Sequence, residues 1–197
     1  IAQANVSSYN QMTYYSLLML QVLYVVMFKS LNSQTALGYG RTNASSTNTG
    51  GSNTRGMFFG EDLAKQQLKF CGIEDFYGNI SYCIDGLCLN SSNEILISNK
   101  NFNDTGNGYT NFGLMASSRL YNYITKVQGG TSTGFIPKEM YGYSTTYYCD
   151  LTQTSPSSLA YFSLGGVSYY QTGSFNLMIN LKPTDSGSTI GARLTYI

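Results

Sequence analysis

The chain has 197 residues, with 11 Lys and Arg against 10 Asp and Glu, a net charge of +1 and only 11% charged residues. This charge-poor composition argues against a nucleic-acid-binding protein, because phosphate binding needs a basic surface. There is no His, which removes the commonest general base and transition-metal ligand, so we expect no enzyme and no metal cofactor. Ser, Thr and Asn total 60 residues and Tyr adds 18, as on a hydroxyl-rich extracellular surface.

The first eleven residues are mostly polar and begin with Ile1 rather than Met. This is typical of a mature N-terminus left after a signal peptide has been cleaved. We therefore expect an extracellular protein at the cell surface.

The segment Tyr14–Phe28 is the most hydrophobic part of the chain, with 13 apolar or aromatic residues out of 15 and no charge. We favour a β-strand that is apolar on both faces and keep two alternatives, a helix packed in an assembly and a membrane span. A strand of this length would reach about 50 Å, which is long for one subunit. As a strand shared between subunits, its polymerisation residues are Tyr14, Leu18, Leu20, Val22, Tyr24, Val26 and Phe28.

Two further segments precede the strand-rich part of the chain. Residues Gly38–Gly56 are rich in Gly, Ser, Thr and Asn and predict a long, flexible loop. Residues Glu61–Phe70 predict a short helix, with acidic residues in the first turn, Lys69 in the last turn and Gly72 beyond the end.

The remaining sequence alternates as strands do. In Ser174–Lys182, the residues Phe175, Leu177, Ile179 and Leu181 share one face. Further predicted strands are Glu94–Ser98, Leu120–Val127, Met140–Asp150, Leu159–Leu164, Val167–Gln171 and Arg193–Ile197. Glycine-rich turns between them favour a mainly β fold, an antiparallel β-sandwich with an Ig-like or pilin-like head. The expected organisation is an extended apolar N-terminal tail, residues 1–30, and a head, residues 31–197.

Four cysteines, Cys71, Cys83, Cys88 and Cys149, allow two disulfides in an oxidising compartment. Asp85-Gly86 is a type I′ hairpin signal, and a turn there would place Cys83 opposite Cys88. Elimination then pairs Cys71 with Cys149. The alternative, four free or metal-binding thiols, is less favoured because the chain lacks the C-x-x-C pairs of a zinc site.

Catalytic and metal motifs are weak. Gly130–Gly134 matches the G-x-S-x-G nucleophile elbow, but the triad around such a serine requires a His. Residues Asn101–Gly106 resemble half of a calcium loop, with Phe112 where the terminal Glu belongs.

Five N-x-[ST] sequons begin at Asn5, Asn43, Asn79, Asn90 and Asn103. Chance alone gives roughly four in this composition, so their number decides little. Their positions in loops or beside the predicted hairpin are typical of attachment sites for N-linked glycans, which we expect on several of them.

An apolar tail strand in front of a β-rich head fits strand donation, in which one subunit's free strand completes the sheet of the next. Such head-to-tail contacts build open filaments. The polar start, the apolar segment Met12–Ser30, the Ser/Thr/Asn/Tyr-rich head and the sequons resemble archaeal surface-filament subunits, above all the thread filaments.

This resemblance implies a glycosylated β-sandwich head joined by donor-strand complementation. The partners it implies are further copies of the chain in a homopolymer, with contacts to a cell surface or to neighbouring filaments in adhesion. The alternatives are a virion capsid or tail component that packs the apolar segment in its assembly, a secreted carbohydrate-binding sandwich, and a glycosidase, for which no carboxylate pair is identifiable.

Overall fold

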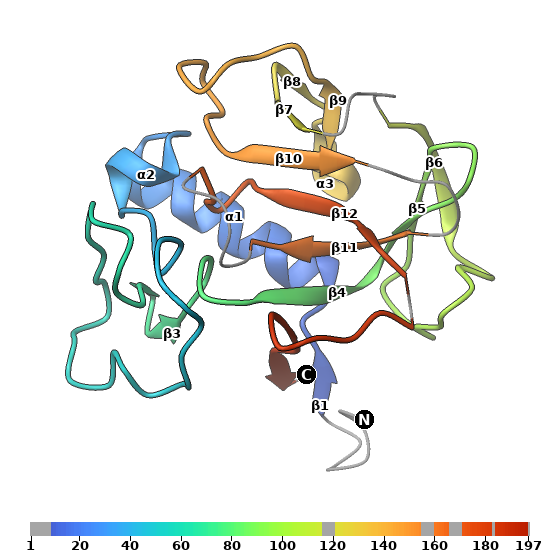
Figure 1. Ribbon diagram of the computed structural model, residues 1–197. Helices are drawn as coiled ribbons and strands as arrows, with labels where there is room; N and C mark the ends of the chain where they lie inside the picture. Colours follow the sequence, from blue (N-terminus) through green and yellow to red (C-terminus); the bar gives the residue numbers. More distant parts are fainter. Residues whose placement is uncertain (1–8, 116–120, 155–159, 166–170, 183, 197) are drawn as a thin grey trace.

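The computed structural model describes residues 9–115, 121–154, 160–165, 171–182 and 184–196, and it confirms a mainly β fold (Figure 1). The helices in this part of the chain are α1 (Tyr14–Phe28), α2 (Ser33–Ala36) and α3 (Gly130–Thr133). The strands are β1 (Tyr9–Gln11), β2 (Lys69–Phe70), β3 (Ile73–Glu74), β4 (Ser81–Leu89), β5 (Glu94–Ile97), β6 (Thr110–Leu114), β7 (Tyr121–Tyr123), β8 (Lys126–Val127), β9 (Pro137–Glu139), β10 (Leu151–Thr154), β11 (Ala160–Leu164), β12 (Leu177–Leu181), β13 (Ile190–Gly191) and β14 (Leu194–Tyr196).

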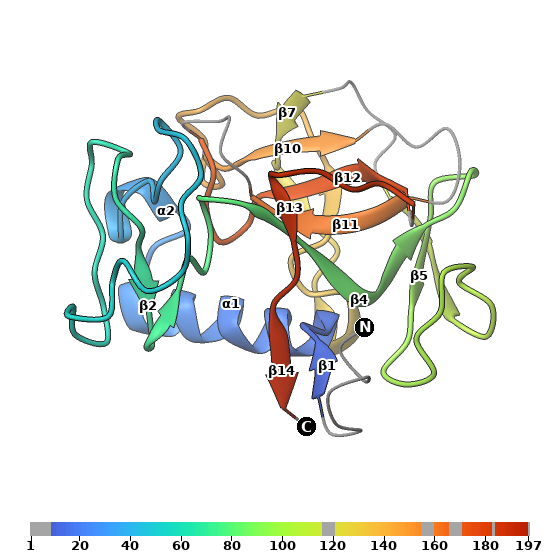
Figure 2. The ribbon, with the colours of Figure 1, turned by 60° about the horizontal axis from the view of Figure 1, so that its bottom comes forward.

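One eight-stranded sheet dominates, in the order β6-β5-β4-β11-β12-β10-β7, with β13 added beside β4. Most of its pairs are antiparallel, but β10 runs parallel to β12 and β13 runs parallel to β4. Three two-stranded sheets, β1-β14, β2-β3 and β8-β9, surround it. Figure 2 shows that α1, rather than a second large sheet, lies against this sheet. The sandwich expected from the sequence is therefore not confirmed.

The principal sheet is strongly curved. Leu114 ends β6 and Tyr121 begins β7, at opposite ends of the strand order, and six residues separate them. Those residues reach at most about 25 Å, whereas the outer strands of a flat sheet of this order would lie about 29 Å apart. Gln128 Nε2 also donates a 3.2 Å hydrogen bond to the main-chain oxygen of Leu114, from the segment beyond β7. The sheet must therefore bend, and α1 packs against one of its faces.

The predicted strand at residues 14–28 is wrong, because these residues form the helix α1. Thr13 is its N-cap: the Thr13 hydroxyl accepts a 3.2 Å hydrogen bond from the Ser16 main-chain nitrogen. The left-handed Lys29, with φ of 51°, closes the other end by donating to the Val25 oxygen. Leucines and methionines, good helix formers, fill the middle of the segment.

Three polar groups that interrupt the apolar run anchor α1 to the rest of the molecule. The Tyr14 hydroxyl donates to the Thr133 oxygen at 2.6 Å, and Gln21 Nε2 donates to the Ser174 oxygen at 2.7 Å. The Tyr24 hydroxyl lies 3.2 Å from the Ser33 oxygen, to which it donates. The Gln21 and Tyr24 bonds are buried and the Tyr14 bond is half-buried, so these groups fix which side of α1 faces inward.

An aromatic cluster fills the space between α1 and the neighbouring segments. The Tyr24 ring contacts the rings of Phe28, Phe70, Phe76, Tyr77 and Phe175, with centroids 4.6 to 6.4 Å apart. Phe70 and Phe76 stack at 5.1 Å. The rings come from α1, the β2–β3 region and the start of β12, so this core joins three distant parts of the chain.

Several local predictions agree with the structure. Strands β5, β11, β12 and β14 lie within the predicted ranges, and Phe175, Leu177 and Ile179 share the buried side of their segment. The predicted strand 120–127 is split into β7 and β8. Residues Gly38–Gly56 contain no helix or strand. The predicted strand Val167–Gln171 falls almost entirely outside the described residues.

Two other local predictions are wrong. Glu61–Phe70 is not a helix, because Ala64 has a φ of 59° and the Glu61 carboxylate instead accepts the main-chain N–H groups of Lys65 and Gln66. Met140–Asp150 contains no strand. It includes a turn in which Thr146 donates back to the Tyr143 oxygen.

The hairpin predicted at Asp85-Gly86 is also wrong, because β4 continues through these residues. Gly86 has a φ of 77° and its oxygen accepts from the Ser98 nitrogen, so the strand bends without reversing. A two-residue hairpin turn with positive φ at both positions lies instead at Cys71-Gly72, with φ of 50° and 79°, between β2 and β3.

Candidate functional site

The outward side of α1 is apolar and exposed. The exposed fractions are 63% for Met19, 47% for Val22, 37% for Leu23, 66% for Val26 and 44% for Met27. Their spacing of three and four residues places all five on one side of the helix. The whole of Tyr14–Phe28 carries no charge, so the outer surface of this helix resembles the buried side of an ordinary amphipathic helix.

Two residues outside the helix extend this surface. Met57 and Phe58 are 59% and 41% exposed. The Phe58 ring meets the Phe28 ring edge-on at 6.2 Å, and the Met57 oxygen accepts from Gly72, next to Cys71. We call Met19, Val22, Leu23, Val26, Met27, Met57 and Phe58 together the α1 face.

The helix divides the residues predicted to form the polymerisation strand. Tyr14, Leu18, Leu20 and Tyr24 are buried against the sheet and its surroundings. Val22 and Val26 point outward and belong to the α1 face, and Phe28 lies between the two sides as part of the aromatic cluster.

The other members of the α1 face were missed at the sequence level, and one signal was available. Thr13 with Ser16 is a helix start, whereas the apolar residues of Tyr14–Phe28 lie on every side of the helix and give no period. The contribution of Met57 and Phe58 had no sequence signal, because the loop that holds them is placed by tertiary contacts.

All four cysteines are free thiols in the structure, which contains neither of the predicted disulfides. Cys83 and Cys88 lie five residues apart on the continuous strand β4, and an extended chain separates such residues by roughly 16 Å, too far for a disulfide. Cys149 is buried, whereas the Cys71 Sγ lies at the edge of the α1 face, 3.8 Å from the Met27 Sδ. Burial raises the pKa of Cys88 and of Cys149 to about 11.

The sequons lie in different environments. Asn43 is exposed in the 38–56 loop, and Asn5 lies outside the described residues. The amides of Asn90 and Asn103 are half-buried and bonded within their own turns. Asn79 is 2% exposed, and its Nδ2 donates to the Thr47 oxygen and to Asp75. A glycan on the Asn79 side chain would require these two hydrogen bonds to break and the side chain to leave its buried position.

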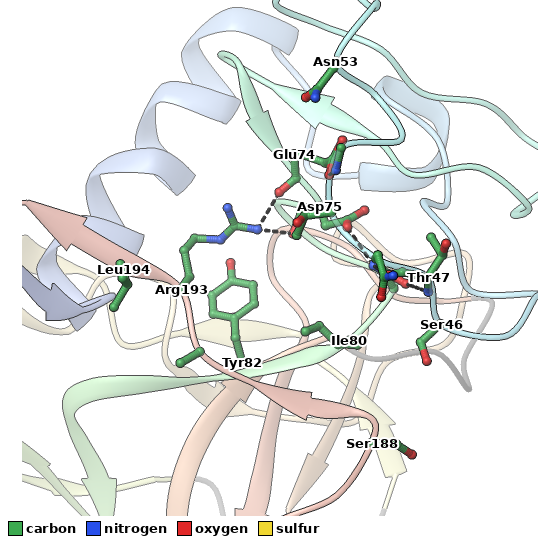
Figure 3. Close-up of a pocket in the computed structure, with 15 residues that line it drawn as sticks. Ser46, Thr47, Asn53, Glu74, Asp75, Ile80, Tyr82, Ser188, Arg193 and Leu194 are labelled. Atoms are coloured by element: carbon green, nitrogen blue, oxygen red, sulfur yellow. Dashed lines mark hydrogen bonds between the residues drawn. The ribbon is translucent and has the colours of Figure 1, made fainter. Parts of the chain in front are cut away.

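A polar cavity of about 930 Å³ lies away from the α1 face, between the 46–53 loop, the β3–β4 connection and residues 188–194 (Figure 3). Arg193 extends across it, and its Nη2 donates to the main-chain oxygens of Glu74 at 2.5 Å and Asp75 at 2.9 Å. The Arg193 guanidinium also lies 5.1 Å from the centre of the Tyr82 ring.

The two acidic side chains beside this cavity differ in their electrostatics. Burial opposes the charge on Glu74, but hydrogen bonds from Ser52 and Gly50 outweigh it and lower the Glu74 pKa. Burial raises the pKa of Asp75, although Gln67 and Asn79 donate to its Oδ2. Glu74 is thus a fixed charge that organises the loop, and Asp75 is a buried carboxyl at the cavity wall.

No group of three or more His, Cys, Asp and Glu side chains in the part of the chain that the structure describes could hold a metal ion. Among the described helices, none has the length and apolar character needed to cross a membrane.

No protein-family model matches the chain, and a comparison with curated proteins finds no significant match.

Proposed function

We propose that this protein is a structural subunit of an extracellular filament and assembles with copies of itself through the α1 face. The observation that carries the proposal is the row of five exposed apolar side chains along an uncharged helix that is firmly anchored on its other side. Assembling proteins bury apolar surfaces of this kind against a partner.

The size of the α1 face favours a polymer over an isolated pair. A 15-residue helix is about 22 Å long and offers a contact on the order of 200 Å², whereas a stable pairwise interface buries about 800 Å² on each partner. A subunit in a filament touches several neighbours at once, so one modest apolar contact contributes to a larger total. We infer that a second copy of the chain covers the α1 face, because a polymer supplies such a partner at every position.

The mode of assembly differs from the one predicted from sequence. Insertion of residues 14–28 as a strand would require α1 to unfold and would remove Tyr24 from the aromatic cluster and Gln21 from its bond to Ser174. Contact through the outer side of an intact helix keeps that core in place.

The proposed location is extracellular, and the most accessible described sequon, Asn43, is the proposed glycan site. The loop that carries Asn43 also lines the polar cavity with Ser46, Thr47 and Asn53, and none of the residues that line this cavity belongs to the α1 face.

Electron microscopy of the purified protein tests this function. The expected result is long fibres for the wild-type chain and loss of fibres for the double variant Met19→Gln/Val26→Gln. Gln is a better helix former than Val and close to Met, so α1 should remain folded. The matched control is Leu63→Gln, which removes a 62% exposed leucine outside the α1 face and should leave the fibres intact. Wild-type protein that stays monomeric at high concentration would contradict the proposal.

A second function uses the same surface. A virion coat protein would also pack a preformed apolar helix against neighbouring copies, and α1 is such a helix. The same micrographs separate the two, since closed shells or capped tubes indicate a coat and open-ended fibres of one subunit indicate a filament.

A further inference from the structure

The polar cavity contains buried polar groups that the fold leaves without partners. Asp75 is 5% exposed, and its Oδ2 accepts from Gln67 Nε2 at 2.6 Å and Asn79 Nδ2 at 2.8 Å. The other carboxyl oxygen, Oδ1, is buried and has no hydrogen-bond partner. Native structures seldom leave a buried acceptor without a hydrogen bond, so we expect Asp75 Oδ1 to accept one from a donor outside the chain.

Arg193, on the same wall, has a buried hydrogen-bond donor without a partner. Its Nη2 is occupied by the oxygens of Glu74 and Asp75, while its buried Nε has no hydrogen-bond partner. Figure 3 shows Arg193 and Asp75 next to each other, with Tyr82 beneath the guanidinium. The two residues on this wall therefore hold one acceptor and one donor without partners.

The charges around the cavity nearly cancel. The Glu74 carboxylate already accepts hydrogen bonds from Gly50 and Ser52 of the loop, so it does not require a cationic ligand. Arg193 opposes a cationic ligand, and the two carboxyl groups oppose an anionic one. The rim consists of hydroxyl and amide side chains, namely Ser46, Thr47, Asn48, Thr49, Asn53 and Ser188.

We propose that this cavity binds a neutral polyhydroxylated ligand, a carbohydrate, through Asp75 Oδ1 and Arg193 Nε. A sugar hydroxyl is both a donor and an acceptor, which matches the two unpaired groups, and a ring of hydroxyl and amide side chains suits the rest of a sugar. The volume of about 930 Å³ lies within the range of small-molecule sites and has room for more than one sugar ring. None of these residues belongs to the α1 face, so the site is independent of the proposed assembly.

The test is a titration of ¹⁵N-labelled protein with methyl α-D-glucopyranoside, methyl α-D-mannopyranoside and N-acetylglucosamine, followed by amide chemical shifts. If the wild-type chain forms fibres, the Met19→Gln/Val26→Gln variant provides the soluble background, so failure of assembly and failure of sugar binding are measured separately. At least one sugar is expected to shift the amides of 46–53 and 188–194.

Two substitutions make the test specific. Asp75→Asn keeps an oxygen for Gln67 and Asn79 and places an NH₂ at the position of Oδ1, so sugar binding should weaken by about tenfold or more. Asp62→Asn, which removes the same charge at an exposed position, should bind as the parent does. Ala192→Trp adds an indole at the exposed rim without touching the buried groups and should also block binding, which keeps the test valid if Asp75→Asn fails to fold.

The source of the sugar is distinguished by a second arm, in which the labelled protein is mixed with unlabelled glycosylated protein before and after enzymatic removal of its glycans. Shifts that disappear on deglycosylation identify a glycan of another copy, and shifts with the free glycosides alone identify a soluble or cell-surface saccharide. The proposal is overturned if no sugar shifts these amides up to about 100 mM, a concentration that would reveal even weak binding. It is also overturned if sulfate or tetramethylammonium shifts them and the sugars do not, or if Asp75→Asn and Ala192→Trp bind as well as the parent.

Discussion

Gln21 Nε2 donates a 2.7 Å hydrogen bond to the main-chain oxygen of Ser174, and both residues are fully buried. The bond joins the middle of α1 to the segment that enters β12, 153 residues later in the chain. A polar residue that interrupts an apolar run in the sequence thus sets the rotation of α1, and with it the direction of Val22 and Val26.

Replacing Gln21 by Met tests this anchor. The change keeps the volume and helix propensity but leaves the Ser174 oxygen without a donor, so the free energy of unfolding should fall by about 1–3 kcal/mol. Urea unfolding followed by circular dichroism measures it. The control is Val22→Met, at the neighbouring exposed position of α1, which should change the free energy of unfolding by less than about 0.5 kcal/mol. Equal losses for the two variants would contradict the anchoring role of the Gln21–Ser174 hydrogen bond.

Asp150 gives the protein a predictable dependence on pH. It is 0% exposed, and burial raises its pKa to about 6 from the ordinary value of 3.8, despite hydrogen bonds from Ser33, Phe175 and Gln34. Because the folded-state pKa lies above the unfolded one, this group's stabilising contribution is full below about pH 3.8 and is lost as the pH rises through about 6.

The measurement is the urea midpoint of the wild type and of Asp150→Asn between pH 3 and pH 7. The difference in unfolding free energy between them should shift by about 2–3 kcal/mol across this range, in favour of the variant at high pH. Asp62→Asn, at an exposed position, should run parallel to the wild type. A constant offset between wild type and Asp150→Asn at all pH values would show that Asp150 titrates normally.

Gly86 should not tolerate a side chain. Its φ is 77°, and a Cβ there would lie 2.3 Å from the Ser98 oxygen, where β4 meets the end of β5. Gly86→Ala is expected to destabilise the fold by more than about 2 kcal/mol, from backbone strain and the clash together.

Gly108→Ala is a matched control for Gly86→Ala. Its φ is 79°, but nothing lies within 4 Å of the added Cβ, so it measures the backbone strain alone. Thermal unfolding of the two variants should show the larger loss for Gly86→Ala, and equal losses would mean that the contact with Ser98 is unimportant.

The cysteines provide a chemical test of the fold. Four thiols per chain should react with Ellman's reagent after unfolding without reductant, because no disulfide is present. In the native state Cys71 should react first, since Cys88 and Cys149 are buried and their pKa values lie near 11. Two or fewer reactive thiols after unfolding, or a melting temperature lowered by reductant, would contradict the free-thiol state.

The sequence by itself determined the mainly β class, several of the strands and the loop at Gly38–Gly56. Alternating residues such as Phe175, Leu177 and Ile179 carry that information locally, since a side-chain period of two requires no knowledge of the partner strand. The sequence also identified residues 14–28 as an apolar segment that requires burial against other parts of the protein or against a partner. One side of α1 is buried within the chain, and the other side, the α1 face, is exposed.

Only the tertiary structure decided what that segment is and which of its residues are accessible. An apolar run without an obvious period fits a strand and a helix equally well. The helix is stabilised by partners outside the run: Ser33 nearby, and Thr133 and Ser174 far along the chain, accept hydrogen bonds from α1. The same reason explains the polar cavity. Asp75 and Arg193 are 118 residues apart, and no local pattern indicates that the path of the chain places the guanidinium of one beside the buried carboxyl of the other.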